Sequence, residues 1–487
     1  MVFMGLSAVS VTNSGLVAGG SGTACEFLEN NGITNDTFTN TGTLLGDIVL
    51  GNGTNKLTNS GLISYDTDYG AGLTHANIFF GSGNDTLDNK GVIDGYVSFG
   101  GGANKGTNSK AITGKDGNGV SLLFGSGDDT FTNAKGATIA GAVDLANGLN
   151  VFTNAGYVGT NGIAESLFGG NSVDTVKNSG TFAADVHLYD GNDVFTNTGQ
   201  VLGVIDLGDG NDVFKGGNFA ETVKDSFGSD TITLGGGNDI FLAFGGEGDG
   251  KDGVGGNLAS DTVDGGAGID TYDGSLVPQD AGYGILVNLD GVNHQVVTKG
   301  TAGNANSSYI DKIKGFENVT GGDFADVIFG SSGANVIKGN GSFDELYGFG
   351  GNDTLDGGDG ADTLTGGLGA DILTGGFYFD IFSYDSIKDS GLTKATRDTI
   401  TDFEDTVDTI DLGDIDANTT LANDQGFSNV LLLGNGTFTA TGQLRIYQTA
   451  TGWMIEGEVT GDGKADFSIA VNDLDHSISW DSVDFSL

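Results

Sequence analysis

The clearest pattern of apolar and polar positions lies between Gly321 and Ser383, which divide into seven nine-residue units without a gap. In every unit the eighth residue is large and apolar: Ile328, Ile337, Leu346, Leu355, Leu364, Leu373 and Phe382. The positions around it alternate, so the eighth side chain is expected to point into a core, as in a short β-strand. Each unit therefore predicts a turn followed by a short strand, and two units are expected to complete one coil of about eighteen residues.

Glycine and aspartate keep an equally strict phase in the turns. The first positions are Gly321, Gly330, Gly339, Gly348, Gly357, Gly366 and Gly375, and the sixth positions are Asp326, Asn335, Asp344, Asp353, Asp362, Asp371 and Asp380. Glycine permits positive φ and close backbone approach, so carbonyl groups can turn inward. Stacked coils would place each carboxylate beside its neighbours, where the repulsion is tolerable only with cations between them. The pattern therefore predicts several calcium ions.

The stretch Gly357–Thr374, GGDGADTLTGGLGADILT, fits the calcium-binding β-helix pattern G-G-x-G-x-D-x-U-x at every position. Here the chain resembles the RTX family of secreted proteins, in which ions lie between successive turns. The resemblance implies that the sixth-position residues are ligands, with Asn335 offering an oxygen but no charge. It also implies contributions from the turn residues Gly351, Gly358, Asp359, Gly360, Gly367 and Gly369. Tyr378 replaces a usual glycine, so the site at Asp380 is expected to be incomplete.

A first RTX-like block with the same phase covers residues 225–275. Asp230 and Asp239 occupy the sixth positions of two contiguous units, and Asp261 and Asp270 those of two more, which makes all four candidate calcium ligands. Between them, the segment 245–252 is a drifted repeat. Its likeness to G-x-G-x-x-G is a weak dinucleotide signal, because no βαβ pattern surrounds it.

Residues 1–224 are predicted to be an N-terminal β-solenoid with a looser repeat. Its acid or amide positions are Asp36, Asn55, Asp85, Asn104, Asp129, Asn150, Asp174, Asp193 and Asp212, with gaps of 19, 30, 19, 25, 21, 24, 19 and 19 residues. Most of these turns are followed by an apolar residue and an Asn-x-Gly turn. The asparagines either form a side-chain ladder along the edge or serve only as turn formers. Because Asp alternates with Asn, calcium is not expected in every coil.

Two further segments complete the chain. Residues 276–320 are interpreted as a spacer with short strands. In residues 384–487, the segments RDTITDFEDTVDTIDL, GDGKADFSI and the final Asp-Phe-Ser-Leu resemble the C-terminal region of serralysin-type proteins, which caps the roll and carries an uncleaved secretion signal. This resemblance implies export by the type I secretion machinery of a Gram-negative cell, in agreement with the lack of an N-terminal signal pattern. One further ion is a candidate at Asp402, Glu404, Asp405 and Asp408.

Composition and charge agree with a folded chain that cations neutralise. Glycine is 90 of 487 residues with one proline, and 65 acidic against 19 basic side chains give a net charge of -46. A hydrophobic fraction of 37% is too high for a disordered acidic tail. The charge disfavours nucleic acid and anionic membranes as partners, and no apolar run approaches the roughly 18 residues of a membrane span. Cys25, the only cysteine, is expected to be a buried apolar residue.

The predicted fold class is all-β: a right-handed parallel β-roll or β-helix solenoid along most of the chain, with a small β cap at the C-terminus. No H-E-x-x-H or G-x-S-x-G motif occurs, and no compact Lys/Arg/His cluster is apparent in the first half. We therefore expect a non-enzymatic extracellular or cell-surface protein, working as a surface-layer, matrix or adhesive component. Its expected partners are calcium and either further copies of itself or a cell-surface polysaccharide. The alternative is a secreted polysaccharide-active lyase, epimerase or hydrolase. A hydrolase would use a pair of carboxylates, and sequence spacing alone cannot identify that pair.

Overall fold

Short strands and tight turns make up nearly all of the computed structural model. The described residues are 2–5, 8–29, 34–65, 77–114, 116–159, 162–243, 261–277, 284–289, 295–299, 308–428, 432–434, 436–473, 477–481 and 483–487. They belong to two compact units, residues 1–239 and 240–487, so the division falls inside the 225–275 block. Among the described residues, no helix is long and apolar enough to cross a membrane.

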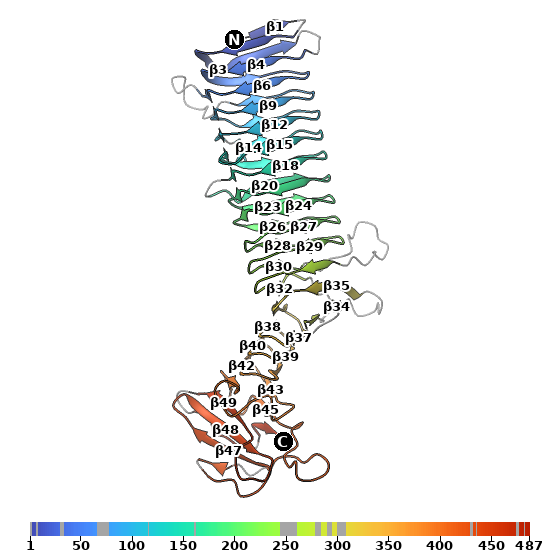
Figure 1. The fold of residues 1–487 in the computed structure, drawn as a ribbon, viewed down its shortest axis with the longest axis vertical. Coiled ribbons are helices and arrows are strands. Elements are labelled where there is room, and N and C mark those ends of the chain that lie inside the picture. The colour runs from blue at the N-terminus through green and yellow to red at the C-terminus, as the bar shows by residue number, and fades with distance from the viewer. Residues whose placement is uncertain are drawn as a thin grey trace. The chain divides into compact units, whose positions relative to one another are not determined.

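Unit 1 is a parallel β-solenoid in which each strand pairs with the equivalent strand of the next coil (Figure 1). The first row of strands is β2 (Ser10–Asn13), β4 (Thr37–Asn40), β6 (Lys56–Asn59), β9 (Thr86–Asn89), β12 (Lys105–Asn108), β15 (Thr130–Asn133), β18 (Val151–Asn154), β21 (Thr175–Asn178), β24 (Val194–Asn197), β27 (Val213–Lys215) and β29 (Thr231–Thr233). Registers such as Phe131 opposite Phe152 and Asn133 opposite Asn154 keep like residues stacked. This stacking follows from the repeat, because equal side chains then occupy equal positions on successive coils.

Two further rows close each coil of unit 1. The second row is the first parts of β3 (Leu16–Glu29) and β5 (Thr43–Val49), then β7 (Leu62–Ser64), β10 (Val92–Ile93), β13 (Ala111–Ile112), β16 (Thr138–Ile139), β19 (Tyr157–Val158), β22 (Thr181–Phe182) and β25 (Gln200–Val201). The third row is β1 (Val2–Gly5), the second parts of β3 and β5, then β8 (Ile78–Phe79), β11 (Val97–Ser98), β14 (Val120–Leu123), β17 (Ala142–Asp144), β20 (Glu165–Gly170), β23 (Asp185–Tyr189), β26 (Val204–Asp206) and β28 (Thr222–Lys224).

Unit 2 is also a parallel β-solenoid, with two rows of strands and shorter coils (Figure 1). One row is β30 (Ile240–Leu242), β32 (Thr271–Asp273), β36 (Asn318–Thr320), β38 (Val336–Gly341), β40 (Thr354–Asp359), β42 (Ile372–Phe377) and β44 (Thr399–Ile400). The other is β31 (Thr262–Asp264), β35 (Ser308–Lys314), β33 (Ile285–Asn288), β37 (Val327–Ser331), β39 (Glu345–Phe349), β41 (Thr363–Thr365), β43 (Ile381–Ser383), β45 (Thr409–Asp411) and β50 (Phe485–Ser486). Thr354 lies opposite Ile372, so one coil is two nonapeptides, as predicted.

Antiparallel pairing interrupts unit 2 in two places. In the spacer, β34 (Gln295–Lys299) pairs antiparallel with both β33 and β35. Near the C-terminus, β47 (Gln443–Gln448), β48 (Gly452–Glu458) and β49 (Phe467–Asn472) form an antiparallel sheet, to which the short β46 (Leu432–Leu433) adds in parallel. This sheet joins the solenoid, because β49 pairs with β44 of the last full coil.

The core of both units is the column of apolar side chains inside the coils. All seven eighth-position residues between Gly321 and Ser383 are fully buried, which confirms the predicted strand orientation. In unit 1, Phe131, Phe152 and Phe195 are equally buried at one position of the first row. Gly106 lacks a side chain at this position, and the ring of Phe131 occupies the space that a Cβ there would need. Cys25 is buried in the third row, as expected of an apolar residue.

Candidate metal centre

The sixth-position residues of unit 2 form two rows of hydrogen-bonded carboxylates. Oδ1 of Asp344 accepts a hydrogen bond from the backbone N–H of Asp326 at 2.7 Å, and Oδ1 of Asp362 accepts one from Asp344 at 2.8 Å. We name the rows after one member each: the 344 row comprises Asp326, Asp344, Asp362, Asp380 and Asp408, and the 353 row comprises Asn335, Asp353, Asp371 and Asp398. Every carboxylate is thus positioned by the backbone of the preceding coil.

Both rows continue past the last nonapeptide. Asp398 follows Asp371 by 27 residues and Asp408 follows Asp380 by 28, instead of the regular 18. The sequence repeat missed Asp398, because residues 384–397 break the nine-residue phase. Of the other predicted acids, Asp402 accepts hydrogen bonds from the turn of the last repeat, and Asp405 accepts one from Ser479. Asp408 belongs to the 344 row, and burial together with the charges of Asp402 and Glu404 beside it raises its pKa.

The second carboxylate oxygen distinguishes the two ends of the 344 row from the other aspartates of both rows. Oδ2 is buried and has no hydrogen-bond partner among the described residues at Asp344, Asp353, Asp362, Asp371, Asp380 and Asp398. At the ends of the 344 row, by contrast, the N–H groups of Gly322 and Glu404 donate to Oδ2 of Asp326 and Asp408. These other aspartates thus each present one bare, buried oxygen, which is costly unless an ion or a proton meets it.

First-position glycines make room for these oxygens. A Cβ on Gly357 would clash with Oδ2 of Asp362 and lie 2.6 Å from the carbonyl oxygen of Gly375. The same holds at Gly339, where a Cβ would clash with Oδ2 of Asp344 and lie 2.6 Å from the carbonyl oxygen of Gly357. Carboxylate and carbonyl oxygens therefore converge beside each glycine. Converging hard oxygens are the donor set that calcium prefers.

Burial dominates the protonation of the rows. It raises the pKa of Asp344 to about 8, of Asp353 and Asp380 to about 7, and of Asp398 to about 9, although backbone N–H donors lower each of them. The pKa values of Asp362 and Asp371 rise to about 6 for the same reason. At pH 7, Asp344 and Asp398 are therefore mostly neutral unless a cation compensates them, whereas Asp362 and Asp371 are mostly ionised. The rows are therefore built for either a proton or a metal ion.

The turns adopt the backbone that the glycine pattern predicted. Gly351, Gly358 and Gly367 have φ between 85° and 123°, whereas Gly360 and Gly369 lie tightly against carbonyl groups of the preceding coil. Asp359 is exposed and accepts a hydrogen bond at its carbonyl oxygen from Ser342. Asn335 donates its amide to the carbonyl of Glu317.

Tyr378 keeps the glycine-like turn conformation, with φ of 84°. Asp380 retains its place in the row and its bare Oδ2. The expected incompleteness at this site is therefore not visible in the carboxylate itself.

Two comparisons with known proteins find similar chains. A family model described as "RTX calcium-binding nonapeptide repeat (4 copies)" matches residues 215–250, 320–348 and 347–377. These segments are RTX repeats. Among solved structures, the chain is similar to the solution structure of the AlgE6R3 subunit of the Azotobacter vinelandii mannuronan C5-epimerase, at 27% identity over 33% of this chain and 77% of that chain, with a TM-score of 0.18. A search of curated protein sequences finds no match.

In the first RTX block, the four predicted aspartates are all buried, but their partners differ. Oδ1 of Asp230 accepts from the backbone of Asp212 and Oδ1 of Asp239 from that of Glu221, so both extend rows of unit 1. The other two aspartates instead donate to side chains of the spacer. The N–H of Asp261 donates to Asp311 at 3.1 Å, and the N–H of Asp270 donates to Glu317 at 2.9 Å. Nonapeptide phase did not reveal these two acids, because the spacer has no repeat. The drifted repeat 245–252 lies outside the described residues.

Unit 1 uses the same turn position, occupied by aspartate in some coils and asparagine in others. Oδ1 of Asp85 accepts from the backbone of Asn55 at 2.7 Å, as in the RTX rows. An asparagine brings its own donor: Nδ2 of Asn150 reaches the carbonyls of Leu145 and Gly148 at 3.0 and 3.1 Å, and Oδ1 of Asp174 at 3.0 Å. The amide thus meets inward carbonyls and a neighbouring carboxylate, which is what a bound cation would do.

Three successive coils of unit 1 lack such an amide. The N–H of Asp174 donates to Oδ1 of Asp193, and that of Asp193 to Oδ1 of Asp212, each at 2.6 Å. Their Oδ2 atoms are buried without a hydrogen-bond partner in the described part of the chain. Burial raises the pKa of Asp174 to about 7 and of Asp193 and Asp212 to about 8. This stretch reproduces the RTX rows outside the residues that the family model matches.

A second row in unit 1 consists of asparagines only. Nδ2 of each donates to Oδ1 of the next at 2.7–2.9 Å along Asn13, Asn40, Asn59, Asn89, Asn108, Asn133, Asn154, Asn178 and Asn197. The remaining N–H usually meets a backbone carbonyl, as from Asn89 to Ala111 at 3.0 Å. The ladder interpretation is therefore confirmed. The row ends where Nδ2 of Asn197 donates to Glu221, the point at which acids replace the asparagines.

Strand register brings one histidine and one lysine of the first half together among acids, which the sequence did not reveal. His187 and Lys224 both face Asp206, at 3.6 and 2.7 Å, and His187 Nδ1 lies 3.1 Å from Glu165. These residues line a cavity of about 300 Å³ on the third row of strands. Register brings them together, because His187, Asp206 and Lys224 are paired positions on successive strands. Two further acids, Asp190 and Asp209, line the same cavity, so its charge does not suit a uronate substrate.

Proposed function

We propose that the chain is a secreted calcium-binding RTX protein that folds on calcium binding and acts as a structural, matrix or adhesive component outside a cell. The observation that carries this proposal is the run of buried Oδ2 atoms that no described group of the protein meets. Calcium takes about six to eight oxygen ligands from carboxylates and carbonyls, and each coil offers both. Export by a type I route, inferred from the serralysin-like segments, belongs to the same proposal.

In unit 2, the proposed ions lie between coils along the 344 and 353 rows. Each would be held by aspartates of neighbouring turns and by the carbonyls beside the first-position glycines. Asp398 joins the predicted ligands, because its Oδ2 is as bare as those of the nonapeptides. Asn335 contributes less, because its amide already meets a carbonyl. The four aspartates of the first block complete the proposed set.

In unit 1, we propose that cations occupy only the stretch that begins at Asp174 and continues through Asp212 to Asp230 and Asp239 of the first block. Oδ2 of Asp85 is also buried without a partner among the described residues, but Asp85 lies between asparagine coils, so no other carboxylate is its direct neighbour in the row. Asp193 lies between two further carboxylates, and their mutual repulsion requires a positive charge or protons. The choice between Asp and Asn at this turn position would then decide where calcium enters the solenoid.

Replacing Asp193 by Asn is expected to lower the calcium content of the full-length protein by one or two ions, because the amide supplies a donor where the ion stood. Native mass spectrometry of protein equilibrated in calcium counts the ions directly. The matched control is Asp85→Asn, the same change between asparagine coils, which is expected to leave the count unchanged. Equal counts for Asp193→Asn and the wild type would contradict a cation in this stretch and favour protonated carboxyl groups.

The structural or adhesive role is supported by the share of the described chain that the solenoid takes up and by the net charge. Almost all described residues belong to the coils, their turns and the C-terminal sheet, which leaves little of the described chain for a separate catalytic domain. A surface with a net charge of -46 repels other copies unless divalent cations bridge them. Calcium would therefore both fold the coils and permit assembly.

Electron microscopy of the purified full-length protein tests the assembly role. Filaments, sheets or lateral clusters are expected in calcium, and dispersed particles after chelation. Sodium chloride at matched ionic strength is the control for simple charge screening, and it is not expected to restore assemblies. Monomeric particles in both calcium and chelator would contradict the assembly role and leave calcium-coupled folding untouched.

A further inference from the structure

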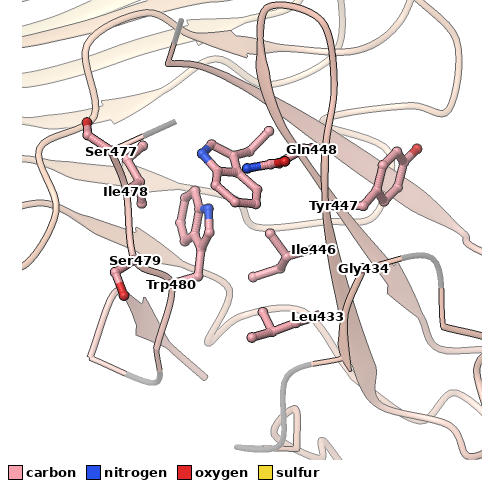
Figure 2. Close-up of a pocket in the computed structure, with 10 residues that line it drawn as sticks. Leu433, Gly434, Ile446, Tyr447, Gln448, Ser477, Ile478, Ser479 and Trp480 are labelled. Carbon is pink, nitrogen blue, oxygen red and sulfur yellow. The ribbon is translucent and has the colours of Figure 1, made fainter. Parts of the chain in front are cut away.

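The C-terminal sheet of unit 2 holds a cavity of about 630 Å³ that the calcium rows do not use. Its walls come from β46, β47 and β48 and from the segment 477–480 (Figure 2). Leu433 and Ile446 form one side, Trp453 and Gln448 the second, and Ser479 and Trp480 the third. Gln448 and Trp453 are direct cross-strand neighbours, so the antiparallel pairing of β47 with β48 fixes them side by side.

Every described residue that lines this cavity is uncharged. That is unusual for a chain with 65 acidic side chains, which place carboxylates around the other cavity described above. Nearby charges are already occupied: Arg445 pairs with Glu456, and Asp473 accepts from the indole of Trp453 at 2.9 Å. The described part of the cavity wall therefore suits a neutral ligand, because a charged one would meet no opposite charge there.

One polar group in the cavity wall lacks a partner. Trp480 is only 7% exposed, and its Nε1 has no hydrogen-bond acceptor among the described residues. Figure 2 shows the Trp480 ring facing Ile446 and Gln448 across the cavity. Phe403 stacks on this ring at 5.1 Å and Trp453 meets it edge-on at 6.4 Å, so its position is fixed by packing. A buried donor held in this way calls for an acceptor on the ligand.

We propose that this cavity binds a neutral saccharide. The half-exposed face of Trp453 offers an aromatic platform for the apolar face of a sugar ring. Trp480 Nε1 donates to a ring or hydroxyl oxygen, and the side chains of Gln448 and Ser479 are available to further hydroxyls. A purely aliphatic ligand would leave the indole N–H unsatisfied, and an acidic sugar would bring uncompensated charge into an uncharged site.

This inference names the partner class of the adhesive role and rests on that role only for its biological meaning. Assembly in calcium depends on the carboxylate rows, whereas sugar binding depends on the C-terminal sheet. Loss of one with retention of the other would therefore identify which proposal fails.

The two tryptophans of the chain, Trp453 and Trp480, both line the cavity, so tryptophan fluorescence reports on this site alone. Titration of the full-length protein in calcium with neutral trisaccharides of glucose, of N-acetylglucosamine and of rhamnose is expected to shift the emission for at least one of them. Isothermal titration calorimetry then gives the affinity. A trigalacturonate and an aliphatic alcohol of similar volume are expected to bind at least about tenfold more weakly.

Trp480→Phe keeps the stacked ring and removes the donor, and it is expected to weaken binding about tenfold, the effect of one lost hydrogen bond. Gln448→Ala, at an exposed side chain whose loss does not threaten the fold, is expected to weaken it about threefold. Tyr347→Phe, on the RTX coils, is the control and is expected to bind as the wild type does. No response to any neutral trisaccharide at millimolar concentration, or equal binding of the trigalacturonate, would overturn the proposal.

Discussion

Removal of calcium is expected to unfold the coils between Gly321 and Ser383 while the asparagine-rich coils between Thr37 and Asn154 stay protected. From Asp344 onward, each RTX coil contains two buried carboxylates whose Oδ2 lacks a donor, so stacking without cations costs two unfavourable burials per coil. In unit 1 the asparagine ladder supplies its own donors. An ion at a hundredfold excess over its Kd stabilises a fold by about 2.7 kcal/mol per site. Several such sites exceed the roughly 5–15 kcal/mol that holds a typical domain folded.

Hydrogen exchange read by mass spectrometry, with calcium and with chelator, measures this directly for both units of one molecule. Circular dichroism during calcium titration should show a cooperative gain of β signal at the same ion concentration that restores protection. The matched variant is Asp362→Ala, which is expected to lose protection in its own coil and in those of Asp344 and Asp380, because their backbone bonds share the row. Full protection of the RTX coils in chelator would contradict the coupling of folding to calcium.

Calcium-free protein is expected to be more stable at about pH 5 than at about pH 8, the reverse of most proteins. Asp344, Asp193 and Asp212 have folded pKa values of about 8, far above the roughly 3.9 of an unfolded aspartate. Between these values the folded state holds more protons than the unfolded state, so the free energy of unfolding falls as pH rises. The stability is fully present below about pH 4 and is lost progressively up to about pH 8. Each unit of pKa shift corresponds to about 1.4 kcal/mol.

Urea denaturation at the two pH values, in buffer stripped of calcium by a chelating resin, measures this difference. With saturating calcium the sign is expected to reverse, because protons then compete with bound ions for the same oxygens. High sodium chloride separates this effect from general self-repulsion, which salt screens, while the cost of burying a carboxylate remains. A calcium-free chain that loses stability on acidification would contradict the interpretation that the rows consist of buried carboxylates that either a cation or a proton must neutralise.

Local patterns were sufficient wherever the repeat is strict. The buried eighth position, the coil of two nonapeptides and the alignment of the sixth-position aspartates follow from a period of nine, because equal spacing brings equal residues to equal places in a solenoid. Asp398, Asp311 and Glu317 occupy equivalent acid positions without the period, and only the fold brings them there. For the asparagines between Asn13 and Asn197, the sequence did not distinguish a side-chain ladder from simple turn formation. Coil-to-coil register decided for the ladder.

By itself, the sequence determined the all-β repeat architecture and its calcium chemistry, since a turn of glycines and one aspartate is a local device that each unit repeats. Tertiary structure alone decided which carboxylate oxygens are left without a donor, where an amide replaces the ion, and which distant residues share a cavity. His187 and Lys224 both meet Asp206 through strand register, and Trp453 meets Trp480 through the folding of the C-terminal sheet. The physical reason is the same in each case. Whether a buried polar group has a hydrogen-bond partner depends on which atoms of other coils lie beside it, and only the register of the folded chain sets that.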